Sequence, residues 1–230
     1  LVASSPELLE QGKGDIWDSG KIESDASQWI TYQGKTLKCN ASYYWKVKID
    51  TNKGATNWSA PAFWTTGLFN EADWQGQWIG LDRAAPGDSE TQWSRLAARY
   101  LRKEFAVKKS VKRATVHIAG MGLYELFING QRIGNQVLAP APTDYRKTIL
   151  YNTYDVTSLL QTENAIGVTL GNGRFYTMRQ NYKPYKIPTF GYPKLRLNLI
   201  VEYADGSKET IATNTSWKLT TEGPIRSNNE

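Results

Sequence analysis

The strongest constraint on the fold lies between residues 120 and 176. There an alternating strand, a tight turn and a short return strand through Ile133 are followed by a second alternating strand. Residues 124–128 (YELFI) alternate between apolar and polar positions and end at Asn129-Gly130. Both turn residues tolerate the positive φ of a type I′ turn, so this segment predicts a β-hairpin. Residues 166–170 repeat the alternation with Ile, Val and Leu on one face. Each strand therefore presents one face to a core.

Further elements of the same kind follow. Residues 195–203 alternate without interruption, and Asp205-Gly206 turns the strand back. Asp155 precedes the short apolar run 156–160, which is typical of one capped helical turn. The chain also holds 9 Trp and 13 Tyr among its 230 residues, residue types that favour strands. The sequence predicts an all-β fold in which an antiparallel β-sandwich carries its ligand-contacting residues on loops.

The first 67 residues contain shorter strand candidates separated by polar turns. Residues 43–49 alternate, which predicts that Trp45, Val47 and Ile49 face inward, and residues 62–66 form the next strand. This arrangement resembles the later part of a fibronectin type III module, with LVASS at its third strand. The chain starts at Leu1 without a Met or a signal-like segment, so we expect a piece of a longer protein. The missing first two strands would leave edges and core uncovered.

These segments predict two domains and a connection between them. A partial fibronectin type III-like domain spans residues 1–67, a linker spans residues 68–80, and a β-sandwich domain spans residues 81–230. The linker carries Trp74 and Trp78 and is not rich in Gly or Ser. We therefore expect a rigid, Trp-anchored connection.

Composition excludes several classes of function. The net charge is +6, but the basic residues are scattered apart from one short cluster between strands, so we expect no nucleic-acid partner. No apolar run is long enough to span a bilayer, so we expect no membrane partner. Cys39 and His117 are the only residues of their types, which rules out an internal disulfide, a cysteine-based metal site and a histidine-based triad. We expect no metal and no cofactor, and a structural role for His117.

Catalysis within the chain would have to use carboxylates. The candidates are Glu104, Glu125, Asp144 and Asp155. Glycoside hydrolysis needs two carboxyl groups about 5–9.5 Å apart across the scissile bond. Nothing in their spacing brings a pair together, because Asp155 serves as a helix cap and Glu125 lies within a strand. The sequence predicts no self-contained catalytic pair.

Two connections carry side chains suited to a sugar. A sugar site needs an aromatic face against the ring and amide or charged groups for the hydroxyls. The candidates for this role are Asp144, Tyr145, Asn172, Arg174, Tyr176 and Arg179. Alternatively, Asp144 and Tyr145 stabilise their own turn while Asn172 occupies a strained loop position. The residues by themselves leave both interpretations open.

Residues 74–230 resemble the amino-terminal region of bacterial α-L-rhamnosidases, the enzymes of glycoside hydrolase family 78. The stretches that carry the resemblance are DWQGQWIG, RYLRKEF, GLYELFINGQRIG, LAPAPTDYRKTILYNTYDVT, NAIGVTLGNGRFY and WKLTTEGPIRSNNE. The preceding fibronectin-like segment fits the domain order of that family. One departure is Arg174-Phe175 after LGNG, where the family often has Trp. Contacts made by that Trp are therefore not carried over.

The resemblance implies a jelly-roll-like (galactose-binding-like) sandwich within a multidomain enzyme that removes terminal α-L-rhamnose with inversion. The catalytic carboxylates would lie in an (α/α)₆ barrel beyond this chain. We therefore expect an inactive accessory fragment that recognises substrate or contacts the barrel through the six candidate residues.

The expected partners are a rhamnose-containing glycoside, oligosaccharide or polysaccharide and the catalytic barrel of the same parent chain. The expected location is the periplasm or the extracellular space. The alternative is a freestanding carbohydrate-binding or adhesion module with no enzyme attached.

Overall fold

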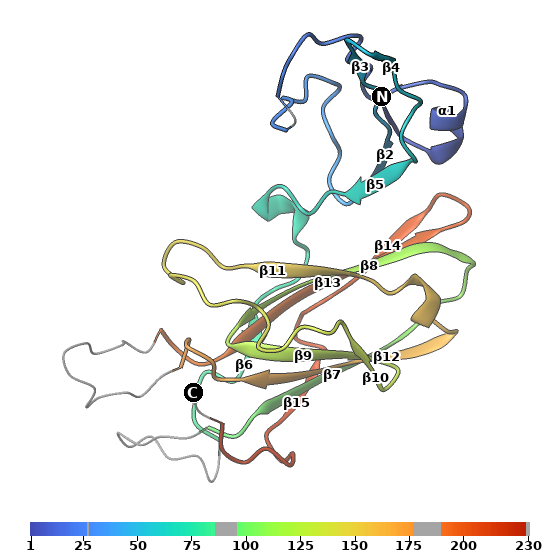
Figure 1. Ribbon diagram of the computed structural model, residues 1–230. Helices are drawn as coiled ribbons and strands as arrows, with labels where there is room; N and C mark the ends of the chain where they lie inside the picture. The colour runs from blue at the N-terminus through green and yellow to red at the C-terminus, as the bar shows by residue number, and fades with distance from the viewer. Residues whose placement is uncertain (27, 86–95, 177–189, 229–230) are drawn as a thin grey trace, which may run out of the picture. The chain divides into compact units, whose positions relative to one another are not determined.

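The computed structural model describes all residues except 27, 86–95, 177–189 and 229–230. The chain divides into two compact units, Leu1–Asp73 and Trp74–Glu230 (Figure 1). The division falls inside the predicted linker, and residues 74–80 belong to the second unit. Within the described residues, no helix has the length and apolar character needed to cross a membrane.

The first unit is built on a small antiparallel sheet of order β1-β2-β5. These strands are β1 (Val2–Ala3), β2 (Ser42–Trp45) and β5 (Ala62–Thr65). A separate hairpin joins β3 (Asp50–Thr51) and β4 (Gly54–Ala55), and short helical segments are α1 (Pro6–Glu10) and η1 (Glu71–Asp73). The sequence around Ser5 favours the start of helix α1. The Ser5 side chain accepts a hydrogen bond from the Leu8 backbone N–H, and proline follows at the first helical position.

The buried aromatic residue of β2 is Tyr43, of which 4% is exposed. Trp45, Val47 and Ile49 are 38%, 44% and 54% exposed, so the prediction that they face inward is wrong. Trp45 is the last paired residue of β2, so Val47 and Ile49 lie beyond the strand ladder. Beyond it, the Val47 backbone N–H donates to the Ser59 hydroxyl instead of to a neighbouring strand.

The second unit consists of two five-stranded sheets whose pairings are all antiparallel. The first sheet is, in order, β10 (Gln131–Ile133), β9 (Leu123–Ile128), β12 (Glu163–Gly171), β7 (Arg99–Ala106) and β15 (Lys218–Thr220). The second is β11 (Tyr151–Asp155), β8 (Val111–Met121), β13 (Lys194–Tyr203) and β14 (Lys208–Ala212), with β6 (Ile79–Gly80) paired to β13. The all-β class and the antiparallel sandwich are confirmed.

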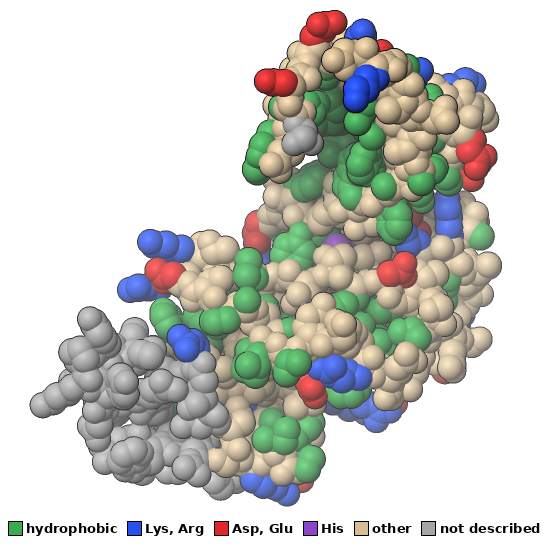
Figure 2. Space-filling view, in the orientation of Figure 1, with side chains coloured by type: hydrophobic (Ala, Val, Ile, Leu, Met, Phe, Trp, Pro, Cys, Tyr) green, Lys and Arg blue, Asp and Glu red, His purple; other side chains and the backbone are tan. Residues whose placement is uncertain are grey.

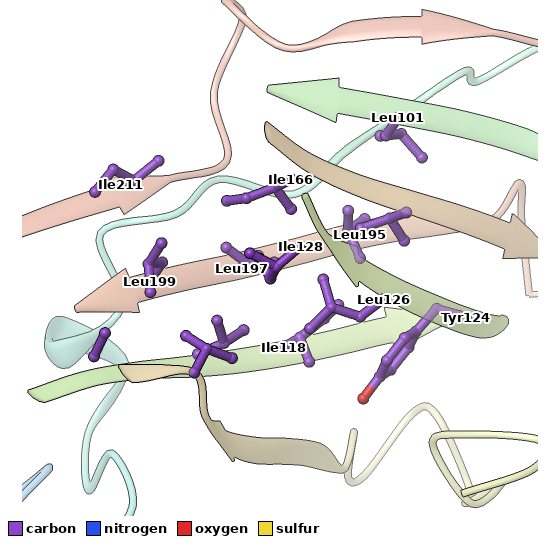
Figure 3. Packing of buried hydrophobic residues seen from close by; sticks show 14 of the residues in the cluster. Leu101, Ile118, Tyr124, Leu126, Ile128, Ile166, Leu195, Leu197, Leu199 and Ile211 are labelled. Atoms are coloured by element: carbon purple, nitrogen blue, oxygen red, sulfur yellow. The ribbon is translucent and has the colours of Figure 1, made fainter. Parts of the chain in front are cut away.

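The core lies between these two sheets (Figure 3). Alternate residues of β13 face inward, and Leu195, Leu197, Leu199 and Val201 are fully buried. They pack with the inward residues of β8, β9 and β12, including Ile118, Leu126, Ile128, Ile166 and Leu170. Burial stabilises the fold by roughly 1.5–3 kcal/mol for each large aliphatic side chain. The predicted alternation of residues 166–170 and 195–203 is therefore confirmed.

The predicted hairpin is also present. Asn129 and Gly130 have φ values of 51° and 81° and join β9 to β10. The Asn129 side chain also holds other elements: its Nδ2 donates to the Leu159 carbonyl and to Asn164 Oδ1, and its Oδ1 accepts from the Ala165 N–H. The turn is therefore tied both to β12 and to the 3₁₀ turn η2 (Thr157–Leu159).

A buried polar layer covers the outer face of the second sheet. His117 and Asn198 are cross-strand partners in β8 and β13, and both are fully buried. Asn198 Oδ1 accepts from the Gly76 N–H at 2.8 Å, and Arg196 Nε donates to the Gly76 carbonyl. Trp74 packs edge-on against Tyr151. Residues 74–77 are thereby fixed to the sheet by hydrogen bonds and ring contacts.

The connections of the second unit differ between its two ends. Strand register places the start of β7, β11 and β13 beside the ends of β8 and β12. The described ends of the long connections 81–98, 134–150 and 172–193 therefore lie at one end of the sandwich, together with the described residues after β15. This end is named the loop end (left in Figure 1). The opposite end has the shorter turns, such as Asn129-Gly130 and residues 204–207.

Substitutions of Asn129 separate its backbone role from its side-chain role. Asn129→Gly keeps the positive φ but loses the side-chain hydrogen bonds, and it should lower the free energy of unfolding by about 1 kcal/mol or more. Asn129→Ala also strains the backbone and should cost roughly a further 1 kcal/mol. Urea unfolding measures both changes. Equal stabilities of the two variants would contradict a strained turn.

His117 predicts a pH dependence of stability. Burial, with a smaller contribution from Arg113, lowers the pKa of His117 to about 4 from 6.5. Between pH 6.5 and pH 4, His117 is therefore protonated in the unfolded chain and neutral in the folded chain. The free energy of unfolding should fall as the pH drops through this range. His117→Asn keeps a polar group near Thr153 and should flatten this fall. The melting temperatures of the unmodified protein and of His117→Asn are measured from pH 7 to pH 4. An equal fall in the two melting temperatures would contradict the role of His117.

Candidate functional site

The loop end is held together by a pair of asparagines. Asn172 follows β12 and is 1% exposed. Its backbone N–H donates to Asn228 Oδ1 at 2.5 Å, and its Nδ2 donates to the Asn228 carbonyl at 2.7 Å. Asn228 in turn donates from its Nδ2 to the Leu96 carbonyl. These bonds join the segment after β15 to the end of β12 and to the residues before β7.

This geometry defines the role of Asn172. The positive φ in the loop belongs to Gly173, at 48°, and not to Asn172. In the described part of the chain, Asn172 Oδ1 is buried and has no hydrogen-bond partner. Because the Asn172 side-chain amide nitrogen donates to the Asn228 carbonyl, Asn172 stabilises the packing of the chain at the loop end. Direct contact between Asn172 and a sugar stays a prediction.

Aromatic rings join the two connections that carry the sugar-binding candidates. Tyr145 packs edge-on against Phe175 and Phe190, with ring centroids 5.2 Å and 5.4 Å away. Tyr176 stacks on Tyr192 at 5.4 Å. Such pairs are worth about 0.5–1.5 kcal/mol each beyond their burial. The connections 134–150 and 172–193 are therefore neighbours, as a shared sugar site requires.

The rings differ in how much surface remains for a ligand. Phe175 and Tyr176 are 7% and 5% exposed, whereas Tyr145 is half-buried and Arg174 is exposed. Phe175 and Tyr176 are therefore buried residues that pack beneath the surface, whereas part of the Tyr145 ring is accessible to a ligand.

Asp144 is ionised and fixed within its own turn. Its Oδ1 accepts from Arg146 Nε at 3.1 Å, and its backbone carbonyl accepts from the N–H groups of Lys147 and Thr148. Hydrogen bonds from the Arg146 side chain hold the pKa of Asp144 below its ordinary value. The carboxylate is an acceptor for hydroxyl donors over the whole neutral pH range.

The structure thus places five of the six candidates at the loop end. Asp144 and Tyr145 lie in one connection, and Asn172, Arg174 and Tyr176 lie in the other. Arg179 lies outside the described residues. Phe190, Tyr192 and Asn228 were not among the residues predicted from the sequence. The two aromatics lie in a segment rich in rings, but no local signal marks Asn228, since its partner is 56 residues away.

Two pairs of the carboxylates considered for catalysis lie apart, Glu104 from Glu125 and Asp144 from Asp155. Glu104 pairs with Arg102, and Glu125 pairs with Arg132 at 3.1 Å. They lie opposite Ala165 and Thr169 of β12, four residues apart, which separates them by about 13 Å along the strand direction.

Asp155 lies beside η2, where its Oδ1 accepts from the Thr157 N–H and hydroxyl. It is the last residue of β11, at the end of the sandwich opposite Asp144. Across the described residues, no three His, Cys, Asp or Glu side chains gather as a metal site would require.

Comparison with known proteins gives a consistent result. Residues 109–230 match a family model described as "Alpha-L-rhamnosidase N-terminal domain", and residues 1–70 match one described as "Rha78A-like, N-terminal immunoglobulin domain". Immunoglobulin and fibronectin type III domains share one sandwich architecture. An alpha-L-rhamnosidase of Formosa agariphila is 37% identical over 249 residues, and one of Alteromonas sp. is 34% identical over 230 residues.

Solved structures agree with this result. The alpha-L-rhamnosidase from Dictyoglumus thermophilum is 40% identical, with a TM-score of 0.87 over 100% of this chain and 26% of that one. The enzyme from Aspergillus terreus is 35% identical, with a TM-score of 0.81 over 90% of this chain and 24% of that one. The Formosa and Alteromonas proteins are matched over 26% and 24% of their length. The chain spans about a quarter of each of these relatives.

Asn172→Ala tests the asparagine pair. The substitution removes the Nδ2 donor to the half-buried Asn228 carbonyl, and it should lower the free energy of unfolding by about 1 kcal/mol because this carbonyl loses its partner. Hydrogen exchange should quicken in the last residues of the chain. Asn214→Ala, at an exposed turn, serves as the control. Unchanged exchange near Asn228 would contradict the assigned role.

Proposed function

Because the chain belongs to the alpha-L-rhamnosidase N-terminal domain family, we propose that it is the non-catalytic accessory region of an alpha-L-rhamnosidase. The catalytic domain would then lie in another part of the same polypeptide. Two findings support this proposal. The relatives named as alpha-L-rhamnosidases are about four times longer, and the carboxylates Glu104 and Glu125 lie four residues apart along β12. A freestanding binding module is less well supported, because the matched relatives are large enzymes.

The proposed role is recognition of the rhamnoside at the loop end. The observation that carries it is the contact of Tyr145 with Phe175, which brings two connections from separate strands together. The exposed surface of Tyr145 would lie against the sugar ring. The Asp144 carboxylate would accept hydrogen bonds from hydroxyls, and Arg174 would donate to them. Asn172 and Tyr176 would hold these groups in place, and Arg179 remains a candidate.

The substrate proposed for the whole enzyme is a rhamnose-containing glycoside, oligosaccharide or polysaccharide. We also propose that the enzyme acts in the periplasm or outside the cell, where such glycosides are encountered. The accessory region would contact the substrate before and during cleavage. Its side chains would then contribute to substrate binding more than to the chemical step.

Kinetics of the full-length enzyme test this role. Asp144→Asn and Arg174→Gln should raise KM for a rhamnoside by about threefold or more with little change in kcat, as expected for lost ground-state binding. Glu163→Gln removes an exposed carboxylate at the opposite end and should leave both constants unchanged. Unaltered KM in both loop-end variants would reject sugar recognition at this site.

Activity of the isolated chain tests the other half of the proposal. The purified 230-residue chain should release no rhamnose from an aryl rhamnoside. Release that is abolished by Asp144→Asn or Glu125→Gln would overturn the non-catalytic assignment.

A further inference from the structure

One row of residues crosses the outer face of the first sheet of the second unit. Strand register places Phe127 of β9 opposite Gly167 of β12, Gly167 opposite Arg102 of β7, and Arg102 opposite Lys218 of β15. Directly opposed residues of antiparallel strands point to the same face. The chain neighbours of Gly167 are buried in the core, so the row lies on the face away from it. Figure 2 shows both basic and hydrophobic side chains on the surface where Figure 1 draws this sheet.

Gly167 leaves an open space in the middle of this row. Among the described residues, a Cβ atom at this position would meet only Phe127 Cβ, at 3.8 Å, an ordinary van der Waals distance. Its φ is not positive, so neither crowding nor backbone conformation requires a glycine. A glycine inside a strand weakens the strand and often marks a place where a ligand approaches the backbone. Phe127 and Arg102 are two strand spacings apart, roughly 9–10 Å, so a ring-sized group fits between them.

A small basic pocket borders the row at its β15 end. The pocket has a volume of about 140 Å³ and is lined by Arg102, Lys103, Glu104, Ser216 and Lys218. Sites for drug-sized ligands usually have about 300–1,000 Å³. The pocket therefore has room for one charged group of a ligand whose remaining part lies over the sheet.

The charge of the pocket is positive and not balanced from within. Arg102 pairs with Glu104, whereas Lys103 Nζ donates to a neutral group, Ser216 Oγ, at 2.8 Å. In the part of the chain that the structure describes, neither Lys103 nor Lys218 forms an ion pair. Arg102 and Lys218 are cross-strand neighbours, and like charges in that position destabilise a sheet. An anion bound between them would remove this repulsion.

The segment before β15 fixes the pocket in place. The Ser216 backbone N–H donates to Asn214 Oδ1 at 2.9 Å, and the Ser216 hydroxyl donates to the same oxygen. The next residue, Trp217, belongs to the core, and its Nε1 donates to the Ala212 carbonyl at 3.0 Å. Lys103, which donates to the Ser216 hydroxyl, is thereby oriented in the absence of a ligand. Preorganised groups bind more tightly, because less conformational entropy is lost on binding.

We propose that this row binds one acidic sugar residue of the substrate. The sugar ring lies over Gly167 against Phe127, and its carboxylate or sulfate group enters the basic pocket. The site uses none of the loop-end candidates. The choice of a sugar as ligand rests on the proposed function, and the acid group follows from the charge of the pocket.

A nucleic acid fits this face less well than a sugar does. Glu104 lines the pocket, and the half-exposed Glu125 carboxylate lies on the same face of the sheet. A nucleic acid carries a phosphate on every nucleotide and would bring negative charge against both glutamates. A sugar with one acid group and several hydroxyls avoids this repulsion, since carboxylates accept hydrogen bonds from hydroxyls.

Calorimetric titration of the full-length enzyme with methyl glucuronide tests the site. This probe contains no rhamnose, so the proposed activity does not consume it. Gly167→Val should raise the Kd at least tenfold, because the valine side chain fills the space over the strand. The melting temperature of this variant should stay unchanged or rise, since valine favours strands. An unchanged Kd in Gly167→Val would place the sugar elsewhere and overturn the proposal.

Two lysine variants test the basic pocket. Lys218→Gln should raise the Kd about threefold or more without lowering the melting temperature, because it also removes a like-charge pair. Lys112→Gln, at an exposed position of β8 in the second sheet, makes the same change in net charge and should leave the Kd unchanged. Equal effects of the two variants would show a general attraction by net charge and would contradict a specific pocket.

Other probes identify the group that binds. Methyl glucoside, which has no acid group, should bind at least threefold more weakly than methyl glucuronide. Tighter binding of glucose 6-sulfate would assign the pocket to a sulfate ester. Inorganic sulfate that binds as tightly as either acidic sugar would show an ion site without a sugar and would overturn the proposal. So would a single-stranded oligonucleotide that binds the enzyme but not Gly167→Val, or the absence of binding by both acidic sugars at millimolar concentration.

The result is separable from recognition at the loop end. Gly167→Val should leave KM for a neutral aryl rhamnoside unchanged, and Asp144→Asn should leave the Kd of methyl glucuronide unchanged. A raised KM in Asp144→Asn without binding of either acidic sugar would keep the proposed function and reject this site. Binding that depends on Gly167, together with an unaltered KM in Asp144→Asn, would do the reverse.

Discussion

The pairing of β8 with β13 is the interaction on which the second unit depends. Its register runs from Lys194 opposite Met121 to Tyr203 opposite Val111. Because side chains alternate between the two faces of a strand, this one pair serves two layers. On the inner face, leucines and isoleucine build the core. On the outer face, His117 and Asn198 form the polar layer that receives the backbone of Gly76. A shift of one residue would exchange the two layers, so the register is strongly specified.

The antiparallel topology also determines where a binding surface can form. Strand direction puts the long connections at one end and the shorter turns at the other. The sandwich supplies a rigid base, and residues far apart in sequence meet at its loop end. Tyr145 with Phe175 and Asn172 with Asn228 are the contacts that join these connections. Substrate recognition, as proposed, would use the polar groups and the half-exposed ring of Tyr145 at this end.

The first unit has a different character. Its main sheet has three strands, and large hydrophobic side chains such as Trp45, Trp58 and Phe63 are 38%, 45% and 68% exposed. An immunoglobulin-type sandwich buries such residues between two sheets.

The sequence by itself determined those strands and turns that depend on residues only a few positions apart in the chain. Alternation marked the strands of the second unit, and Asn129-Gly130 marked the hairpin, because face and turn geometry depend on residues only a few positions apart. Alternation misplaced Trp45, which pairs with Val2 and Ala62 and is still 38% exposed, since burial also requires a layer packed against that face. Only the tertiary structure showed Asn172 bound to Asn228, because sheet order brings these distant residues together. Short-range patterns therefore predicted the sandwich, and strand order decided what gathers at its loop end.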